Sequence, residues 1–293
     1  MISVLIPTYN CGPYLRDSLD SILGQTLPPG EVIVVDDGST DETPDVLASY
    51  GDCIRVVPGR HEGKTSGVSR NLCLQHARGE WIAFHDADDV ARPDRLARHR
   101  AFLAETPDFD AVFANGERMD GAGRVVRVEH VQRAVGQRLD ARVLFEGFPI
   151  YFQGALVPRH AFEAAGEFDA QLRVQPDIDY AYRLFAHCRA GFVDEVVFDY
   201  RWHTTNNSRD RLGSREDIAR ILERLDGTNP QAAELIGRRE LRERISRHHY
   251  RIARVRLAQG DRSGAERSLA RALAMRPWSA RSRLLQLRML TSS

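Results

Sequence analysis

Short β-branched apolar runs alternate with amphipathic segments over the first hundred residues of the chain. Four runs are typical of buried strands that stop at turn residues: ISVLIP, EVIVV, IRVV and EWIAF. Apolar residues at helical spacing mark the segments around them, at 11–27, 66–79 and 92–105, and 39–50 opens with a helix-capping pattern. Strand and helix in this order predict an α/β fold with a mostly parallel sheet covered by helices.

The most polar clusters of this region follow three of the predicted strands. PTYN comes after the first strand, DDGSTD after the second and HDADD after the fourth. Ligands of parallel sheets bind at the carboxyl ends of the strands. In the last cluster, Asp86, Asp88 and Asp89 repel one another by about 4 kcal/mol per close pair at an effective dielectric constant of 20. A bound cation would remove that cost, whereas the alternative is a solvated acidic turn.

Composition narrows the class of protein. No apolar run approaches the roughly 20 residues of a membrane span, and the four cysteines are scattered, which favours a reduced cytosolic protein. From Arg238 onward, fifteen arginines and four acidic residues give a net charge of +11, so the first 237 residues carry −11. The arginines lack interleaved aromatic residues, and the predicted ligand edge is acidic, so a nucleic acid is not the expected partner.

The pattern becomes all helical after about residue 213. The segment 251–277 predicts two helices broken by QGD and resembles one helical pair of the tetratricopeptide type. Such a pair needs a neighbour to bury its apolar face. The basic helices could contact the acidic first part of the chain, an anionic membrane surface or a second copy, and the sequence leaves these three options open.

Four motifs in the same order resemble family-two glycosyltransferases with the GT-A fold: VLIPTYNCGPYLRDSLDSILGQT, VIVVDDGSTDET, GVSRNLCLQHARGEWIAFHDADD and YRWH. The resemblance is dense over residues 1–105, patchier to about 205 and absent beyond. It implies a Rossmann-like GT-A catalytic domain at 1–205, followed by a basic α-helical region at 206–293.

The resemblance also implies a donor site for a nucleotide-diphosphate sugar. Asp37 is the expected uracil contact, and Asp86 is expected at the ribose or sugar. The donor-binding residues expected are Pro7, Thr8, Tyr9, Asn10, Asp36, Asp37, Arg70 and Asp86. Of these, Arg70 is not implied by the resemblance: it would stabilise the departing diphosphate, and the alternative is that it pairs with a surface carboxylate. Taken alone, PTYN is equally consistent with a strand-ending turn, and Asp41 is expected to cap a helix.

A divalent cation, Mn²⁺ or Mg²⁺, would bridge the aspartates and the donor diphosphate. We expect Asp88 to be its direct ligand, and Asp89 to lie behind the ligands or to cap the following helix. A lone histidine after a strand is more often structural, but the resemblance to the YRxH pattern assigns His203 to the metal or diphosphate.

Transfer to an acceptor hydroxyl needs a base. By the resemblance, Asp177 matches that base, although Pro176 stands where the family carries glutamate. The alternative is that Asp177 and Asp179 only complement the dipole at the start of a helix. Gly154, Asp179 and Arg183 are weaker candidates for acceptor or sugar contacts, and the nearby aromatics Phe148, Tyr151 and Phe152 fit a sugar platform or the core equally well.

The function implied is an inverting, metal-dependent hexosyltransferase, with a UDP-sugar favoured as donor and a glycan or lipid-linked acceptor. The resemblance places it in bacterial cell-surface polysaccharide or glycoconjugate synthesis. The expected location is the cytoplasm, including peripheral contact with the inner face of the plasma membrane. Two alternatives remain: a catalytically impaired nucleotide-sugar-binding scaffold, and a sugar-phosphate nucleotidyltransferase, which would need a glycine-rich basic loop where the chain has PTYNCGPYL.

Overall fold

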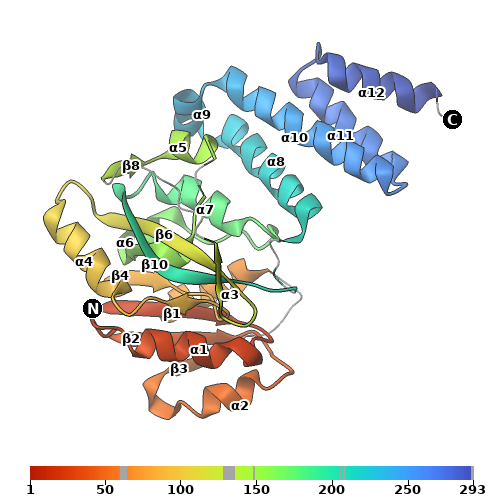
Figure 1. Cartoon of the computed structure of the whole chain (residues 1–293). Coiled ribbons are helices and arrows are strands. Elements are labelled where there is room, and N and C mark those ends of the chain that lie inside the picture. Colours follow the sequence, from red (N-terminus) through yellow and green to blue (C-terminus); the bar gives the residue numbers. More distant parts are fainter. Residues whose placement is uncertain (60–64, 128–135, 148, 205, 207–208, 292–293) are drawn as a thin grey trace. The chain divides into compact units, whose positions relative to one another are not determined.

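A mixed sheet organises the first part of the protein (Figure 1). The computed structural model describes residues 1–59, 65–127, 136–147, 149–204, 206 and 209–291, and within them ten strands form this sheet. The strands are β1 (Ile2–Thr8), β2 (Glu31–Asp36), β3 (Arg55–Pro58), β4 (Trp81–Phe84), β5 (Val90–Ala91), β6 (Ala111–Asp120), β7 (Val125–Arg127), β8 (Gln137–Leu139), β9 (Ala155–Pro158) and β10 (Ala190–Trp202). Their main order is β3-β2-β1-β4-β9-β6-β10-β5, with β7 beside β6 and β8 beside β10.

The four strands predicted from the apolar runs form the parallel half of the sheet. β1 pairs in parallel with β2 and β4, and β2 pairs in parallel with β3. Val4 and Leu5, which point to opposite faces of β1, are both fully buried, as are Val34 and Val35 of β2. Burial on both faces explains why these strands are continuous apolar runs and do not alternate with polar residues.

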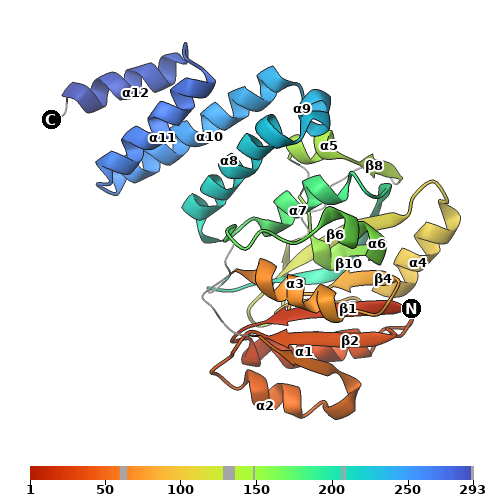
Figure 2. The ribbon, with the colours of Figure 1, turned by 180° about the vertical axis from the view of Figure 1, so that it is seen from behind.

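Helices pack on both faces of the sheet. Leu15, Leu19 and Ile22 of the first helix join one core cluster with Val4 and Ile6, and α3 packs against β1 and β2 on the side seen in Figure 2. The helices of this part are α1 (Gly12–Leu23), α2 (Thr43–Ala48), α3 (Ser66–His76), α4 (Arg95–Glu105), α5 (Ala141–Phe145), α6 (Arg159–Ala165) and α7 (Pro176–Leu184), with short 3-10 helices at Gly51–Cys53 and Phe152–Gly154. The predicted α/β fold with flanking helices is confirmed.

The second half of the sheet is mixed. β9 runs antiparallel to both β4 and β6, whereas β6 and β10 are parallel. Register shifts between Val193 and Phe198 interrupt the β6–β10 pairing. Such bulges re-aim a strand, and the end of β10 carries Arg201, which contacts two of the aspartates described below.

Aromatic side chains fill the core beside β4. Phe152 is fully buried and packs edge-on against Phe84, and Phe168 stacks on Tyr180 with ring centroids 3.8 Å apart. Phe152 is therefore a core residue, while Tyr151 is 37% exposed. Phe148 lies outside the described residues.

Contacts divide the chain into two compact units, one of Met1–Leu172 with Asp179–Asn206 and one of Arg173–Ile178 with Asn207–Ser293. The second unit is helical, and its helices are α8 (Arg211–Thr228), α9 (Pro230–Ile236), α10 (Arg238–Ala258), α11 (Arg262–Met275) and α12 (Ala280–Thr291). α10 packs on α8 and α11. A small apolar cluster lies within the helical unit and is formed by Ala253, Ala265, Leu269 and Met289.

The predicted break at QGD separates α10 from α11. Gly260 takes a positive φ of 82°, and the Asp261 carboxylate then accepts a hydrogen bond from the N–H of Gly264 at 2.8 Å, which caps α11. Over the described residues, no helix combines the length and the hydropathy that crossing a bilayer would require.

Candidate active site

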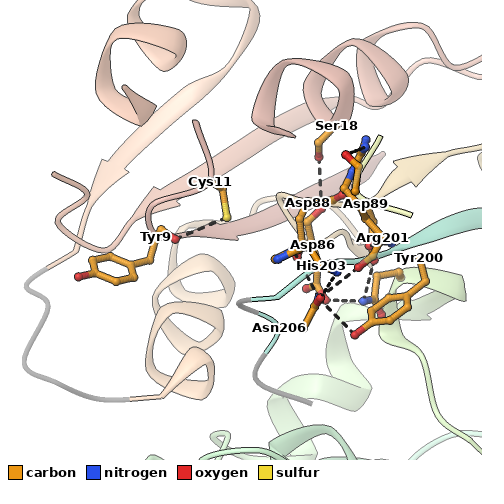
Figure 3. Close-up of polar contacts among 12 residues, drawn as sticks. Tyr9, Cys11, Ser18, Asp86, Asp88, Asp89, Tyr200, Arg201, His203 and Asn206 are labelled. Atoms are coloured by element: carbon orange, nitrogen blue, oxygen red, sulfur yellow. Dashed lines mark hydrogen bonds and ion pairs between the residues drawn. The ribbon is translucent and has the colours of Figure 1, made fainter. Parts of the chain in front are cut away.

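Three carboxylates gather at the carboxyl end of β4. Asp86, Asp88 and Asp89 follow this buried strand, and one candidate ligand atom from each lies within 4.8 Å of the others (Figure 3). β1, β2 and β4 are parallel neighbours, so the loops that follow them share one edge of the sheet. The structure thus brings the acidic cluster to the ligand-binding edge of a parallel sheet.

Asp88 is contacted by residues from the segment that follows β10. Nε2 of His203 lies 2.8 Å from Oδ2 of Asp88, and the Asn206 amide donates to the same oxygen at 3.5 Å (Figure 3). The His203 ring stacks on Tyr14 with centroids 4.8 Å apart. Among the described residues, no hydrogen-bond donor contacts Oδ1 of Asp88, so this oxygen can accept a further partner.

The Asp86 carboxylate accepts hydrogen bonds from a guanidinium group and from a side-chain amide. Nη2 of Arg70 donates to Oδ1 of Asp86 at 3.0 Å, and the side-chain amide of Gln153 donates to Oδ2. Arg70 is only 4% exposed. In this structure the predicted donor-binding arginine therefore orients Asp86, and both oxygens of that carboxylate have protein partners.

Asp89 is fully buried behind the other two aspartates. Its Oδ1 accepts from the backbone N–H of Arg201 at 2.9 Å, and its Oδ2 accepts from the Gln153 amide at 3.1 Å. Burial, followed by repulsion from the two neighbouring aspartates, raises the pKa of Asp89 well above its ordinary value. Helix α4 begins only at Arg95, so the expectation that Asp89 caps it is wrong; the residue is buried beside Asp86 and Asp88.

The Arg201 side chain clamps the aspartate turn. Its Nε donates to the backbone carbonyl of Asp88 at 2.8 Å, and its Nη2 pairs with Asp17 at 2.9 Å. The guanidinium also lies over the Tyr14 ring at 5.0 Å. Since Tyr14 in turn stacks on His203, Arg201 positions both the turn and the imidazole that contacts it.

A buried histidine–arginine pair lies beneath the cluster. Nε2 of His85 is 3.2 Å from the carbonyl oxygen of Asp89, and Nη1 of Arg95 is 3.3 Å from Nδ1 of His85. Burial, with the adjacent guanidinium, lowers the pKa of His85 well below its ordinary value. Burial also lowers the pKa of Arg95 to about 9, against the opposing attraction of Asp89 and Asp86. At neutral pH the pair therefore places one positive charge under the aspartates and offsets part of their repulsion.

The loops after β1 and β2 are tied together. Asn10 adopts a positive φ of 49°; its N–H donates to the hydroxyl of Ser39 at 2.9 Å, and its side-chain oxygen accepts from the N–H of Thr40 at 2.8 Å. These contacts leave Tyr9 43% exposed at the loop tip, while Asp37 is nearly buried at 9%. Of the predicted donor residues, Asn10 joins the two loops and Tyr9 is presented to solvent.

The remaining predicted residues of this region lie at the ends of the two strands and in the turn after β2. Pro7 and Thr8 belong to the end of β1, and Thr8 is buried. Asp36 accepts from the N–H of Ser39 at 3.0 Å. Asp41 accepts from the N–H groups of Thr43 and Gly12. Burial would raise the pKa of Asp41, but these hydrogen bonds outweigh it and lower the pKa.

The predicted base lies at the start of α7. Pro176 is the first residue of the helix and Asp177 the second, and both belong to the segment Arg173–Ile178 that groups with the helical unit. Proline is well tolerated in a first helical turn, so its presence in place of glutamate does not disturb α7.

The weaker candidates all have local packing roles. Arg183 pairs with Asp179 at 2.9 Å and donates to the backbone carbonyls of Glu167 and Ala165. The pair therefore fastens α7 to the loop before it. Gly154 is buried, and a Cβ at this position would lie 2.6 Å from the carbonyl oxygen of Ala114, so the packing requires glycine there.

Gln153, Arg201 and Asn206 contact carboxylates of the cluster and were not predicted. Arg201 lies within the YRWH motif, two positions before His203, and that proximity was the available signal. Asn206 lies in the polar run that follows the same motif. Gln153 stands in a segment of mixed pattern, and nothing in its sequence neighbourhood indicates that its amide would bridge Asp86 and Asp89.

Comparison with known proteins gives the family. The model of the glycosyl transferase family 2 matches residues 3–164. An uncharacterized glycosyltransferase of Rickettsia prowazekii (strain Madrid E) is 31% identical over 225 residues, which are 74% of this chain and 70% of the relative. Bacillus subtilis (strain 168) TuaG, whose name assigns it to teichuronic acid biosynthesis, is 39% identical over 108 residues, 36% of this chain and 42% of TuaG.

A solved structure shows the same fold. The crystal structure of S. aureus TarS 1-349 in complex with UDP-GlcNAc superimposes with a TM-score of 0.72 at 18% identity, and covers 94% of this chain and 81% of that one. The family match spans the loops after β1 and β2 and the three aspartates described above. The chain belongs to glycosyl transferase family 2.

Proposed function

We propose that this glycosyltransferase is metal-dependent and inverting, and that it transfers a sugar from a UDP-sugar to an acceptor hydroxyl. The proposal rests chiefly on the hydrogen-bond partners of the Asp88 carboxylate. Its Oδ2 lies 2.8 Å from Nε2 of His203, and its Oδ1 has no hydrogen-bond donor among the described residues. A carboxylate oxygen and an imidazole nitrogen are thus presented together at a cluster of three carboxylates.

These residues suit a hard divalent cation. Asp88 would hold it through Oδ1, and His203 would add a nitrogen, a ligand set that Mn²⁺ accepts readily and Mg²⁺ less so. Asp86 and Asp89 already have hydrogen-bond partners on both oxygens, so they would shape the site from behind. When bound, the cation supplies positive charge that neutralises the diphosphate as it leaves with the bonding electrons.

The donor nucleotide would lie against the joined loops. Asp37 would accept a hydrogen bond from the uracil ring N–H, and the exposed ring of Tyr9 would contact the base or ribose. Asp86, oriented by Arg70, would face the ribose or sugar. The TarS complex with UDP-GlcNAc supports a uridine donor by its shared fold.

Asp177 is the proposed base. Its carboxylate would take the proton of the acceptor hydroxyl while the hydroxyl oxygen bonds to the anomeric carbon and the bond from that carbon to the diphosphate breaks. A single displacement of this kind inverts the anomeric centre. We propose a glycan or lipid-linked acceptor of bacterial cell-surface polysaccharide synthesis, with the name of TuaG as support, and action in the cytoplasm at the inner face of the membrane.

A donor panel tests these roles. Thermal shift and nucleotide release are measured with UDP-, dTDP- and GDP-sugars, with and without Mn²⁺, on the wild type, Asp88→Asn, Asp177→Asn and the exposed control Asp108→Asn. We expect a UDP-sugar to stabilise the wild type and the control only with Mn²⁺, and Asp88→Asn to abolish that shift. Asp177→Asn should keep the shift and lower turnover by about 10²–10⁴-fold.

Each contrary outcome removes a defined part of the proposal. Binding of every donor without metal would reject the metal role of Asp88. Wild-type binding without turnover on any acceptor would favour the nucleotide-sugar-binding scaffold. If no nucleotide sugar binds under any condition, the aspartate cluster is not a donor site.

A further inference from the structure

Helix α12 has two apolar faces, of which the helical unit covers one. Leu285 and Met289 pack against the small apolar cluster of α10 and α11. The opposite face exposes Leu284, Leu287 and Leu290, at 52%, 59% and 68% of their surface. Spacing by three residues places these leucines along one side of the helix. Contiguous exposed apolar surface of this kind marks an interaction site more often than scattered single residues do.

A tryptophan precedes the same helix. Trp278 is 91% exposed and lies in the turn between α11 and α12. An indole ring combines a large apolar body with one N–H donor, and this combination favours the boundary between lipid and water.

The charged residues of the segment that carries this surface are all basic. The segment 276–291 contains four arginines and no acidic residue: Arg276, Arg281, Arg283 and Arg288. Arg276 pairs with Glu243 at 2.6 Å. Arg283 donates to the carbonyl of Pro277 at 3.1 Å and keeps its positive charge uncompensated by any carboxylate among its described partners.

We propose that the surface formed by Trp278, Leu284, Leu287 and Leu290 with Arg281 and Arg283, here called the α12 surface, docks on an anionic lipid bilayer. The leucines and the indole would enter the headgroup region, and the arginines would meet the lipid phosphates. Charge complementarity selects this occupant. In a two-fold dimer the surface would face its own copy, and the arginines of one protomer would then oppose those of the other.

Docking of the α12 surface would bring the enzyme to the lipid-linked acceptor proposed above. Only this purpose of docking rests on the proposed function. Vesicle binding is measured without donor or metal. Failure of docking and failure of the proposed transferase chemistry are therefore separate results.

The test is vesicle flotation of the full chain with phosphatidylcholine alone and with added phosphatidylglycerol. We expect binding only to the mixed vesicles, weakened by high salt. The double variant Arg281→Gln/Arg283→Gln should lower the partition coefficient about fivefold for each charge removed. Leu284→Gln/Leu287→Gln should lower it by roughly tenfold or more.

Matched controls lie elsewhere in the helical unit. Leu235→Gln, on α9 and also 52% exposed, and Arg239→Gln/Arg247→Gln, on exposed positions of α10, should bind as the wild type does. Circular dichroism verifies that every variant is folded, and the two surface doubles test the proposal independently of each other.

Three results would overturn the proposal. Equal binding to neutral and anionic vesicles would remove the role of charge. Control variants that weaken binding as much as the surface variants would remove the role of this face. Light scattering that shows a wild-type dimer converted to a monomer by Leu284→Gln/Leu287→Gln, with no change in flotation, would assign the surface to a second copy.

Discussion

Nε2 of His203 lies 2.8 Å from Oδ2 of Asp88, although 115 positions separate the two residues in the chain. The contact joins the loop after β4 to the residue that follows β10, and the stacking of Tyr14 on the imidazole holds the ring in place. The contact brings two sequence motifs to one site, because HDADD contains Asp88 and YRWH contains His203.

The first prediction concerns this pair. His203→Ala should weaken the Mn²⁺-dependent part of donor binding by about 10–100-fold, the usual range for loss of a metal ligand or its close support. Titration calorimetry with Mn²⁺ and UDP measures it. The exposed residue His187 supplies the control His187→Ala. Unchanged Mn²⁺ affinity in His203→Ala would show that the histidine neither binds the cation nor orients Asp88 for it.

The second prediction concerns Gln153, which is 4% exposed and donates to both Asp86 and Asp89. Gln153→Leu removes this donor and leaves two carboxylate oxygens without it, so the free energy of unfolding should fall by about 1–3 kcal/mol. Mn²⁺ affinity should fall as well, because both aspartates lose their orientation.

Urea unfolding measures the stability effect, with the exposed Gln231→Leu as control. Gln153→Glu separates charge from shape, since it adds a fourth carboxylate in nearly the same volume. If Gln153→Glu is as stable as the wild type at neutral pH, repulsion among the carboxylates of this cluster does not lower the free energy of unfolding.

The third prediction compares two glycines. A Cβ at Gly154 would lie 2.6 Å from the Ala114 carbonyl oxygen, a backbone atom that cannot rotate away, whereas a Cβ at Gly227 in α8 meets nothing within 4 Å. Gly154→Ala should therefore destabilise the protein by about 1–3 kcal/mol. Gly227→Ala should stabilise it by about 0.5 kcal/mol through helix propensity. Opposite shifts in melting temperature are expected, and a neutral Gly154→Ala would contradict the packing argument.

The fourth prediction concerns pH and His248 of α10. Burial, with the positive charges of Arg251, Arg215 and Arg244 and of the adjacent His249, lowers the pKa of His248 from 6.5 to about 4. Between these values the unfolded chain binds a proton that the folded chain does not. Stability is therefore fully present above pH 6.5 and declines as the pH falls toward 4.

The decline due to this residue should be on the order of 2 kcal/mol. It is measured by urea unfolding at several pH values, and His248→Gln should flatten the profile in this window. The exposed His187→Gln should leave the profile unchanged. An unaltered profile in His248→Gln would assign the acid sensitivity to other groups, such as Glu223, whose pKa is lowered chiefly by its hydrogen bond with His249.

Much of the first unit could be predicted because its signals are local. Each apolar run of the parallel half contains its own strand pattern, and each ends at a turn residue. Asp86, Asp88 and Asp89 were predicted to cluster because they lie at most three positions apart in the sequence. The antiparallel insertion of β9 between β4 and β6 could not be predicted, since strand order depends on contacts between distant segments.

Within the site, too, contacts between distant segments could not be predicted. Gln153, Arg201 and Asn206 contact the aspartates only because β9 and β10 return to the edge where β4 ends. The expectation that Asp89 caps a helix followed from its position before a helical pattern. It was wrong because α4 begins at Arg95, and because the carboxylate is instead buried under hydrogen bonds from Arg201 and Gln153.

Local sequence patterns account for the elements of the parallel half, the break between α10 and α11 and the acidic cluster after β4. These follow from periodicity, turn residues and capping, which act over a few neighbouring positions. Only the tertiary structure decided which oxygen of Asp88 faces His203, which aspartate is buried, and which leucines of α12 are exposed. Those properties depend on packing between segments far apart in the chain, because burial and hydrogen-bond partners exist only once the segments meet.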